Sequence, residues 1–278
     1  MNRALVVGIG DYGRLMQDLP GCANDRAGWS QALRGALGLG GTELRVRADA
    51  QATKLTLLND LAWLLDNVSP GDQRVFFFAG HGARLRRRDP VTGIADDVID
   101  ETIVAYPGTS GDYEGFMLFD ADLAAMIDQS GFPSSARLTL VMDSCHSGGM
   151  MRRLIVGEPL DVPLPRCLMI EEEEKALSRA WLAQPTVRSF GSLDRAQTQV
   201  QRVILAAARA EQPAWDDRMP NGLRHGVFSY HALNALAAQP AISFSDMVAT
   251  IAPLIAARFP QVPTLLGDSS RFSNRMFN

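Results

Sequence analysis

Two apolar runs each end in a side chain that can do chemistry: Arg74-Val75-Phe76-Phe77-Phe78-Ala79-Gly80-His81-Gly82 and Leu138-Thr139-Leu140-Val141-Met142-Asp143-Ser144-Cys145-His146-Ser147-Gly148-Gly149. Continuous apolar runs of this length are typical of strands buried on both faces of a parallel sheet. Functional side chains gather at the carboxyl ends of such strands in open α/β sheets. We therefore expect His81 and Cys145 at the same edge of one sheet.

Strands and helices alternate along the rest of the chain, which indicates a mostly parallel α/β sheet. The further predicted strands are Ala4–Ile9, Leu44–Val46, Thr102–Tyr106, Val203–Ala208 and, as an edge strand limited by Pro263, Val262–Leu266. Helices are predicted after Asn24 or Asp25 as the cap, after Thr53, from Asp120, over Val227–Leu236 and over Ser245–Phe259. The stretch Gly149 to Gln201 has a weak pattern and is interpreted as a long surface connection.

Composition narrows the class of protein. The 278 residues carry a formal net charge of -4, so no basic footprint indicates a nucleic-acid partner, and the cluster at Arg84 and Arg86–Arg88 fits a solvated loop. The chain has three cysteines, Cys22, Cys145 and Cys167, and so small and uneven a number does not indicate a disulfide framework. Free thiols persist in a reducing compartment, which favours the cytoplasm. No apolar stretch approaches the length of a membrane span.

An imidazole and a thiol together can perform nucleophilic acyl transfer, in which the imidazole takes the thiol proton and the thiolate attacks a carbonyl carbon. The neighbouring glycines would let a substrate backbone approach and leave N–H groups free for an oxyanion. His225 or His231 could be the base only if the fold brought them back to Cys145. His146 is the residue after Cys145, so it cannot easily face the thiol from the same strand end. Cys145 and His146 lack the paired spacing of a zinc site.

The chain resembles the caspase-like cysteine peptidases, and among them the metacaspases and bacterial orthocaspases. Four stretches carry the resemblance: Ala4–Ile9, Gly21–Asp25, Phe78–Gly82 and Asp143–Gly148. Ala207–Gln212 and Gly226–Tyr230 add a weaker similarity to the small-subunit half of that domain. The similarity spans nearly the whole chain and is poorest over Gly149 to Gln201.

The resemblance implies a caspase-type three-layer sandwich with a mostly parallel central sheet flanked by helices. It implies one peptidase domain over 1–278, with a large-subunit-like part (1–150), a connecting loop (about 150–201) and a small-subunit-like part (202–278). Cys145 and His81 would form the dyad, and the backbone N–H groups of Gly82 and Cys145 the oxyanion hole. The pocket for the residue before the cut bond (P1) would be acidic, with its positions matched by Asp25, Asp143, Cys22 and Ala79.

A basic P1 residue is also favoured by physical reasoning. Asp143 lies two residues before Cys145, so both side chains could share one face of a strand. A carboxylate there raises the thiol pKa unless a cation neutralises it, and a substrate Arg or Lys would do so. The plain alternatives are a strand-end residue for Asp143 and a helix N-cap for Asp25. Ala79 stands where the family often has Ser, which removes one pocket hydrogen bond and leaves the preference for Arg over Lys open.

The resulting prediction is a cysteine endopeptidase that cuts proteins or peptides after Arg, then Lys, as a cytoplasmic monomer with no required cofactor. Self-processing is expected in the connection, which contains Arg152, Arg153, Arg166, Lys175, Arg179 and Arg188. Asp96, Asp97, Asp100 and Glu101 are candidate calcium ligands by resemblance, but a solvated acidic loop is the favoured interpretation, with at most modest activation. The alternatives are a catalytically silent caspase-like scaffold and another acyl-transfer enzyme such as a thioesterase.

Overall fold

The computed structural model describes residues 1–13, 15–88, 95–108, 115–145, 162–168 and 201–277. Its centre is a six-stranded sheet in the order β12-β9-β7-β3-β1-β2. The strands are β1 (Arg3–Gly8), β2 (Leu44–Ala48), β3 (Gln73–Ala79), β7 (Arg137–Asp143), β9 (Gln201–Ala206) and β12 (Thr264–Gly267). All neighbours pair in parallel except β12, which runs antiparallel to β9. The predicted α/β class is confirmed.

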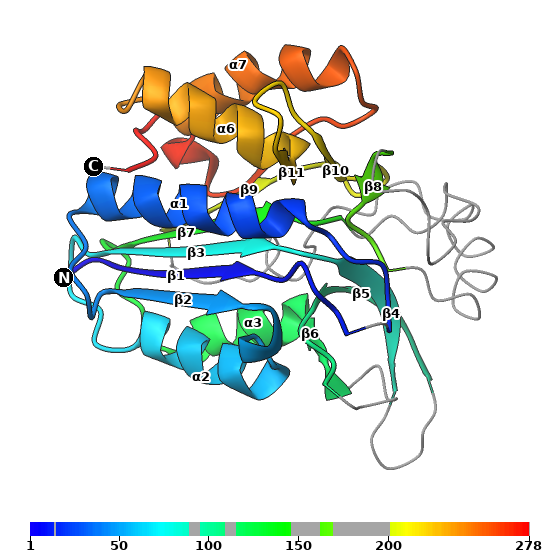
Figure 1. Cartoon of the computed structure of the whole chain (residues 1–278). Coiled ribbons are helices and arrows are strands. Elements are labelled where there is room, and N and C mark those ends of the chain that lie inside the picture. The colour runs from blue at the N-terminus through cyan, green and yellow to red at the C-terminus, as the bar shows by residue number, and fades with distance from the viewer. Residues whose placement is uncertain (14, 89–94, 109–114, 146–161, 169–200, 278) are drawn as a thin grey trace.

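Helices cover both faces of this sheet and make three layers (Figure 1). One face carries α1 (Gly21–Leu37), α6 (Val227–Ala238) and α7 (Phe244–Ala256), and the other carries α2 (Lys54–Leu65) and α3 (Asp120–Gln129). The strands β9 and β12 come from the last part of the chain and extend the sheet begun by β1 to β7. The two parts therefore share one sheet.

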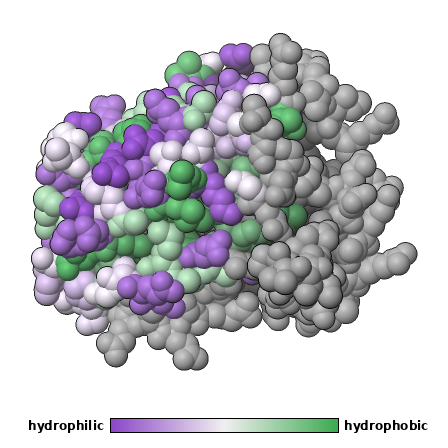
Figure 2. Space-filling view, turned by 90° about the horizontal axis from the view of Figure 1, so that it is seen from below, coloured by the Kyte–Doolittle hydropathy of each residue, from purple (hydrophilic) through white to green (hydrophobic). Residues whose placement is uncertain are grey.

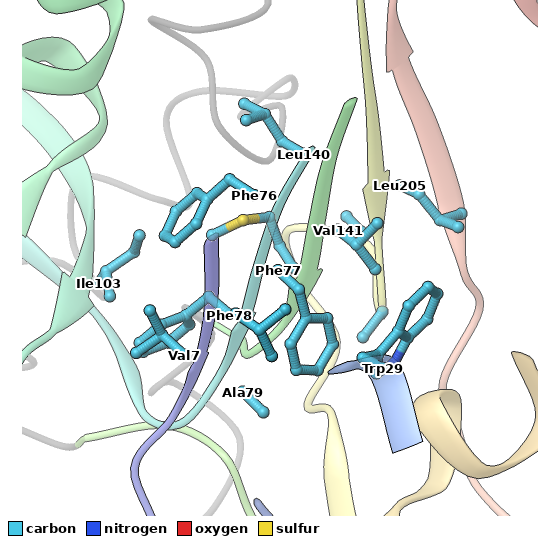
Figure 3. Packing of buried hydrophobic residues seen from close by; sticks show 14 of the residues in the cluster. Val7, Trp29, Phe76, Phe77, Phe78, Ala79, Ile103, Leu140, Val141 and Leu205 are labelled. Carbon is cyan, nitrogen blue, oxygen red and sulfur yellow. The ribbon is translucent and has the colours of Figure 1, made fainter. Parts of the chain in front are cut away.

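The aromatic residues of β3 pack against the helices on both faces of the central sheet. Successive side chains of a strand point to opposite faces, so Phe77 lies on the α1 side and Phe76 and Phe78 on the other (Figure 3). Phe77 stacks on Trp29 of α1, with ring centroids 5.1 Å apart. Both rings are fully buried, and Trp29 Nε1 donates to Ser229 Oγ of α6 at 3.1 Å. Trp29 thus fixes α1 against both the sheet and α6.

Two small sheets lie beyond the carboxyl ends of the parallel strands (Figure 1). One contains β4 (Gly82–Arg88), β5 (Ala95–Val104) and β6 (Met117–Phe119), and the other β8 (Leu164–Pro165), β10 (Trp215–Arg218) and β11 (Arg224–Gly226). Of their strands, only part of β5 was predicted, because the others are short, polar or interrupted by proline. They enclose the edge that carries His81 and Cys145.

Two local predictions need correction. Neither Asn24 nor Asp25 caps the first helix, because α1 begins at Gly21 and Asp25 is a buried residue inside it. The described part of the connection, 162–168, is no surface loop, since Leu164, Arg166 and Cys167 are buried; most of the remaining connection lies outside the described residues. The Thr53 cap is confirmed, as Thr53 Oγ1 accepts from Thr56 N.

The face opposite α1 mixes polar and apolar side chains where it is described (Figure 2). Its exposed apolar residues include Leu55 of α2, whose surface is 70% exposed. None of the described helices combines the length and the apolar character that crossing a membrane requires.

Candidate active site

His81 lies two residues beyond the end of β3, and contacts with three other residues hold it. Its backbone N–H donates to the Tyr12 hydroxyl at 2.9 Å, and its backbone carbonyl accepts from Val104 N at 3.0 Å. Its imidazole Nε2 lies 2.6 Å from the carbonyl oxygen of Gln17. The Tyr12 ring packs against the imidazole, with centroids 4.9 Å apart. The side chain is therefore fixed before any substrate enters.

The Gln17 contact determines which ring nitrogen of His81 carries the proton. A carbonyl oxygen can only accept, so Nε2 must donate and the neutral ring leaves its lone pair on Nδ1. Nδ1 is buried and has no hydrogen-bond partner among the described residues. Burial lowers the pKa of His81 from 6.5 to about 4; the Gln17 hydrogen bond opposes this shift and the Arg166 charge adds to it. The ring therefore presents a neutral base.

Cys145 lies two residues beyond the end of β7 and is 2% exposed. Its Sγ lies 3.8 Å from the carbonyl oxygen of Ala214, to which the thiol donates. No hydrogen bond joins this thiol to the His81 imidazole among the residues that the structure describes. The two side chains nonetheless belong to neighbouring strand ends, since Ala79 pairs with Asp143 in the β3–β7 ladder.

The predicted oxyanion donors converge on one oxygen atom. Gly82 N donates to the carbonyl oxygen of Arg166 at 3.0 Å, and Cys145 N donates to the same oxygen at 3.2 Å. This is the arrangement that stabilises developing negative charge on a carbonyl oxygen during acyl transfer. A peptide carbonyl of the chain itself therefore lies where a substrate carbonyl is expected.

The predicted pocket acids also converge, and again on Arg166. The fully buried guanidinium lies 2.5 Å from Asp25 Oδ2 through Nη2 and 3.0 Å from Asp143 Oδ2 through Nη1. Gly226 forms the wall, because a Cβ there would overlap the Asp143 carboxylate and the guanidinium. Burial raises the pKa of Asp143 to about 6; Arg166 opposes the rise and Asp25 adds to it.

A third acid, Asp216 of β10, was missed by the sequence reasoning. Its Oδ2 lies 3.0 Å from Arg166 Nη2 and accepts from Gly21 N at 3.0 Å, while its Oδ1 accepts from Arg224 Nε at 2.9 Å. Burial raises the pKa of Asp216, and Arg166 opposes this. The pocket thus holds three buried carboxylates against one guanidinium, with Arg224 as a second cation. The sequence around Asp216 is short, polar and flanked by prolines, so it predicted neither a strand nor a pocket residue.

Cys22 and Ala79 occupy the surroundings of this pocket. Cys22 is buried in the first turn of α1, and burial raises the pKa of its thiol, with Arg166 opposing and the three carboxylates adding to the shift. Ala79 is fully buried at the end of β3. Its methyl group supplies no hydrogen bond, as the sequence led us to expect.

The two alternative bases in the described chain lie elsewhere. His225 Nδ1 lies 2.8 Å from Asp25 Oδ1, so its ring faces the acidic pocket. His231 lies on α6, half-buried beside Tyr230. His146 lies outside the described residues.

Residues 164–168 hold Arg166 as an extended peptide. β8 pairs antiparallel with β10, with Pro165 opposite Trp215 and Leu164 opposite Asp216. Arg166 N donates to Ala214 O at 2.8 Å, and beyond Arg166 the Leu168 N donates to Gly82 O at 2.8 Å. Backbone bonds thus flank the Arg166–Cys167 peptide bond on both sides, which is how an extended peptide is recognised by strand addition.

The candidate calcium acids lie along β5. The side chains of Asp96 and Asp97 fall outside what the structure describes. Glu101 is buried and pairs with Arg84 at 3.0 Å. Asp100 is its neighbour on the strand, so the two carboxylates point to opposite faces. In the described part of the chain, no three His, Cys, Asp or Glu side chains are grouped to hold a metal ion.

Comparison with known proteins agrees with this geometry. The family model described as "Metacaspase, peptidase C14 domain" matches residues 2–153. Metacaspase-1 of Schizosaccharomyces pombe and Metacaspase-1 of Coccidioides immitis are each 25% identical to the chain over 95% of its length, covering 66% and 60% of their own. The chain therefore spans less than two thirds of the length of these relatives.

A solved structure shows the same fold. The crystal structure of a protein from Geobacter sulfurreducens superposes with a TM-score of 0.66 at 18% identity, covering 100% of this chain and 98% of the other. The family match covers more than half of the chain and includes both His81 and Cys145. The chain therefore belongs to the metacaspase family of peptidase C14 domains.

Proposed function

We propose that the chain is a cysteine endopeptidase that cuts after Arg and Lys through Cys145 and His81. One observation carries the proposal. The buried side chain of Arg166 lies among three carboxylates while its carbonyl oxygen accepts from Gly82 N and Cys145 N. A basic P1 residue and a scissile carbonyl would require the same two contacts.

The proposed chemistry uses the lone pair on His81 Nδ1 and the backbone N–H donors of Gly82 and Cys145. The Cys145 thiol gives its proton to Nδ1 of His81, and the sulfur attacks the carbonyl carbon of the P1 residue. The carbonyl oxygen becomes an oxyanion between Gly82 N and Cys145 N. The imidazolium, held through Nε2 by Gln17 O, then protonates the leaving amine, and water hydrolyses the thioester.

The charges of the pocket select the P1 residue. Asp25, Asp143 and Asp216 supply three negative charges. Arg224 pairs with Asp216 and balances one of them. An arginine side chain can bind two carboxylates through separate nitrogens, whereas lysine offers a single point charge. An acidic P1 residue would meet like charge in a buried site, which costs several kcal/mol. We therefore expect Arg over Lys, and Asp near background.

The test is kcat/KM for matched peptides that carry Arg, Lys or Asp before the cut bond. Cys145→Ala is the control for contaminating proteases. Efficient cleavage after Asp, or activity that survives Cys145→Ala, would contradict the proposal. An intact fold with no cleavage of any peptide would favour the scaffold function instead.

Self-processing is proposed at one bond, Arg166–Cys167. Its carbonyl lies in the oxyanion site and its P1 side chain in the pocket. The same contacts block the site to other peptides as long as this segment stays bound. The chain would thus be its own first substrate, and Arg166→Gln should both prevent the cut and weaken the block.

Mass spectrometry of the purified chain tests this assignment. Wild type should yield two pieces, 1–166 and 167–278, and Cys145→Ala only the intact chain. Arg166→Gln should abolish this cut, while Arg153→Gln, a second basic residue of the connection, should leave it unchanged. A wild-type chain that cleaves peptides yet stays whole, or is cut only elsewhere, would disprove the assigned bond.

The remaining proposals are coarser. We propose a monomeric enzyme of the cytoplasm, where its three free cysteines would stay reduced. It would require no cofactor, since the proposed mechanism uses only protein groups. Calcium is expected to act weakly, because Glu101 is paired with Arg84 and faces away from Asp100.

A further inference from the structure

We propose that His225 is a positioning residue of the primary pocket, which orients the Asp25 carboxylate toward a basic P1 side chain. The inference rests on the proposed function, because it concerns the same pocket. His225 is 8% exposed on β11, between Arg224 and Gly226, and belongs to neither the dyad nor the oxyanion site.

The two oxygens of Asp25 have separate partners. Oδ1 lies 2.8 Å from Nδ1 of His225. Oδ2 accepts from Gly226 N at 2.8 Å and from Arg166 Nη2 at 2.5 Å. Without His225, Oδ1 would be buried without this donor and the carboxylate could rotate away from the guanidinium. The imidazole therefore fixes the direction in which Asp25 presents its charge.

A second side chain fixes the tautomer of His225. Asn221 Oδ1 accepts from Leu223 N at 3.1 Å, so its amide nitrogen Nδ2 points toward His225 Nε2, 3.2 Å away. Nδ2 can only donate, so Nε2 accepts and the ring proton lies on Nδ1, facing Asp25. Tyr230 packs against the ring at 5.6 Å between centroids.

This tautomer gives His225 a defined role in specificity. A neutral N–H donor orients Asp25 without cancelling its charge, whereas a Lys or Arg in that place would compete with the P1 cation. Asp25, Asp143 and the Oδ2 atom of Asp216 then remain available to a substrate guanidinium. His225 should therefore affect how well the enzyme distinguishes a charged from an uncharged P1 side chain, and not the reaction at Cys145.

The experiment compares two peptides that differ only in Arg or citrulline at P1, since citrulline has the shape of arginine without its charge. An internal competitor such as Arg166 lowers kcat/KM for both peptides by the same factor, so the ratio reports the pocket alone. The variants are His225→Leu, which removes the donor, and His225→Asn, whose amide can replace the Nδ1 donor. His231→Leu is the matched control, since His231 also lies beside Tyr230.

We expect His225→Leu to lower the arginine-to-citrulline ratio about tenfold, as for loss of one hydrogen bond to a buried charge. His225→Asn should recover most of the ratio, and His231→Leu should leave it unchanged. An unchanged ratio in His225→Leu, or equal losses in both His225 variants, would overturn the assignment. A wild-type chain that cleaves peptides but does not prefer arginine over citrulline would overturn the proposed basic specificity, and this inference with it.

Discussion

Replacing Asp143 by Asn should remove a large part of the preference for arginine while leaving the reaction at Cys145 in place. Asparagine has the same shape as aspartate, and its amide oxygen can still accept from Ser229 N, which lies 3.2 Å from Asp143 Oδ2. Only the charge facing the P1 guanidinium is lost. The variant therefore isolates the electrostatic contribution of this one carboxylate.

The magnitude follows from the geometry of Arg166. The guanidinium Nη1 lies 3.0 Å from Asp143 Oδ2, and two unit charges at about 3 Å attract by roughly 5 kcal/mol at an effective dielectric constant of about 20. Desolvation of the guanidinium cancels part of this, and breaking buried charge pairs usually costs roughly 2–5 kcal/mol. We expect a loss of roughly 2–4 kcal/mol, which is about 30- to 1,000-fold in the ratio of kcat/KM for the arginine peptide to that for the citrulline peptide.

The assay measures kcat/KM for the arginine and citrulline peptides in parallel. Asp217→Asn is the matched control, because Asp217 is the next residue of β10 but pairs with Arg258, at 3.2 Å, outside the pocket. The arginine-to-citrulline ratio should fall, because any release of Arg166 from the pocket changes both values by the same factor. Equal losses for both peptides would mean that Asp143 acts on the reaction at Cys145 and not on P1 selection. No loss for either peptide would mean that Asp143 does not contact the P1 side chain.

Three further predictions test the site and the fold. Lowering the pH through about 6 should reduce the preference for arginine over citrulline, because the raised pKa of Asp143 means that it takes up a proton and loses its charge below that value; a flat ratio from pH 8 to 5 would contradict this. Millimolar calcium should change kcat/KM by no more than about threefold, and a rise of several tens-fold that Asp100→Ala abolishes would make β5 a calcium site. Trp29→Ala should lower the free energy of unfolding by about 3–5 kcal/mol in urea titrations, since the fully buried ring stacks on Phe77; a loss below about 1 kcal/mol would show that α1 is held by other contacts.

The sequence predicted the central sheet because its strands are apolar throughout. Phe76–Phe78 and Leu138–Met142 can only be accommodated between two layers of helices, and their polar ends then meet at one edge. The place of His81, Cys145 and Asp143 at this edge was therefore predictable from local pattern alone. Asp25 was predicted as a pocket residue only through resemblance, and its plain interpretation as a helix cap was wrong because α1 begins four residues earlier.

Other parts of the site depend on contacts that leave no local pattern. Gln17 contributes a backbone carbonyl, which any residue type could supply. Asp216 and His225 lie in strands of three or four residues whose pairing brings them to α1 from nearly 200 positions away. Arg166 was one of seven basic residues in the connection, and nothing in the sequence distinguishes it from the others. Its place depends on the backbone pairing of Leu164–Leu168 with distant segments.

The most direct test of the site is covalent labelling of the wild-type chain with a peptide probe that carries arginine at P1 and a thiol-reactive group in place of the scissile bond. Mapping the labelled peptide by mass spectrometry should find the probe on Cys145 and on neither Cys22 nor Cys167, with no labelling by the matching probe that carries aspartate. His81→Ala should slow the labelling strongly. Labelling that is spread over the three cysteines, or that is equally fast with aspartate at P1, would contradict a Cys145 nucleophile served by an acidic pocket.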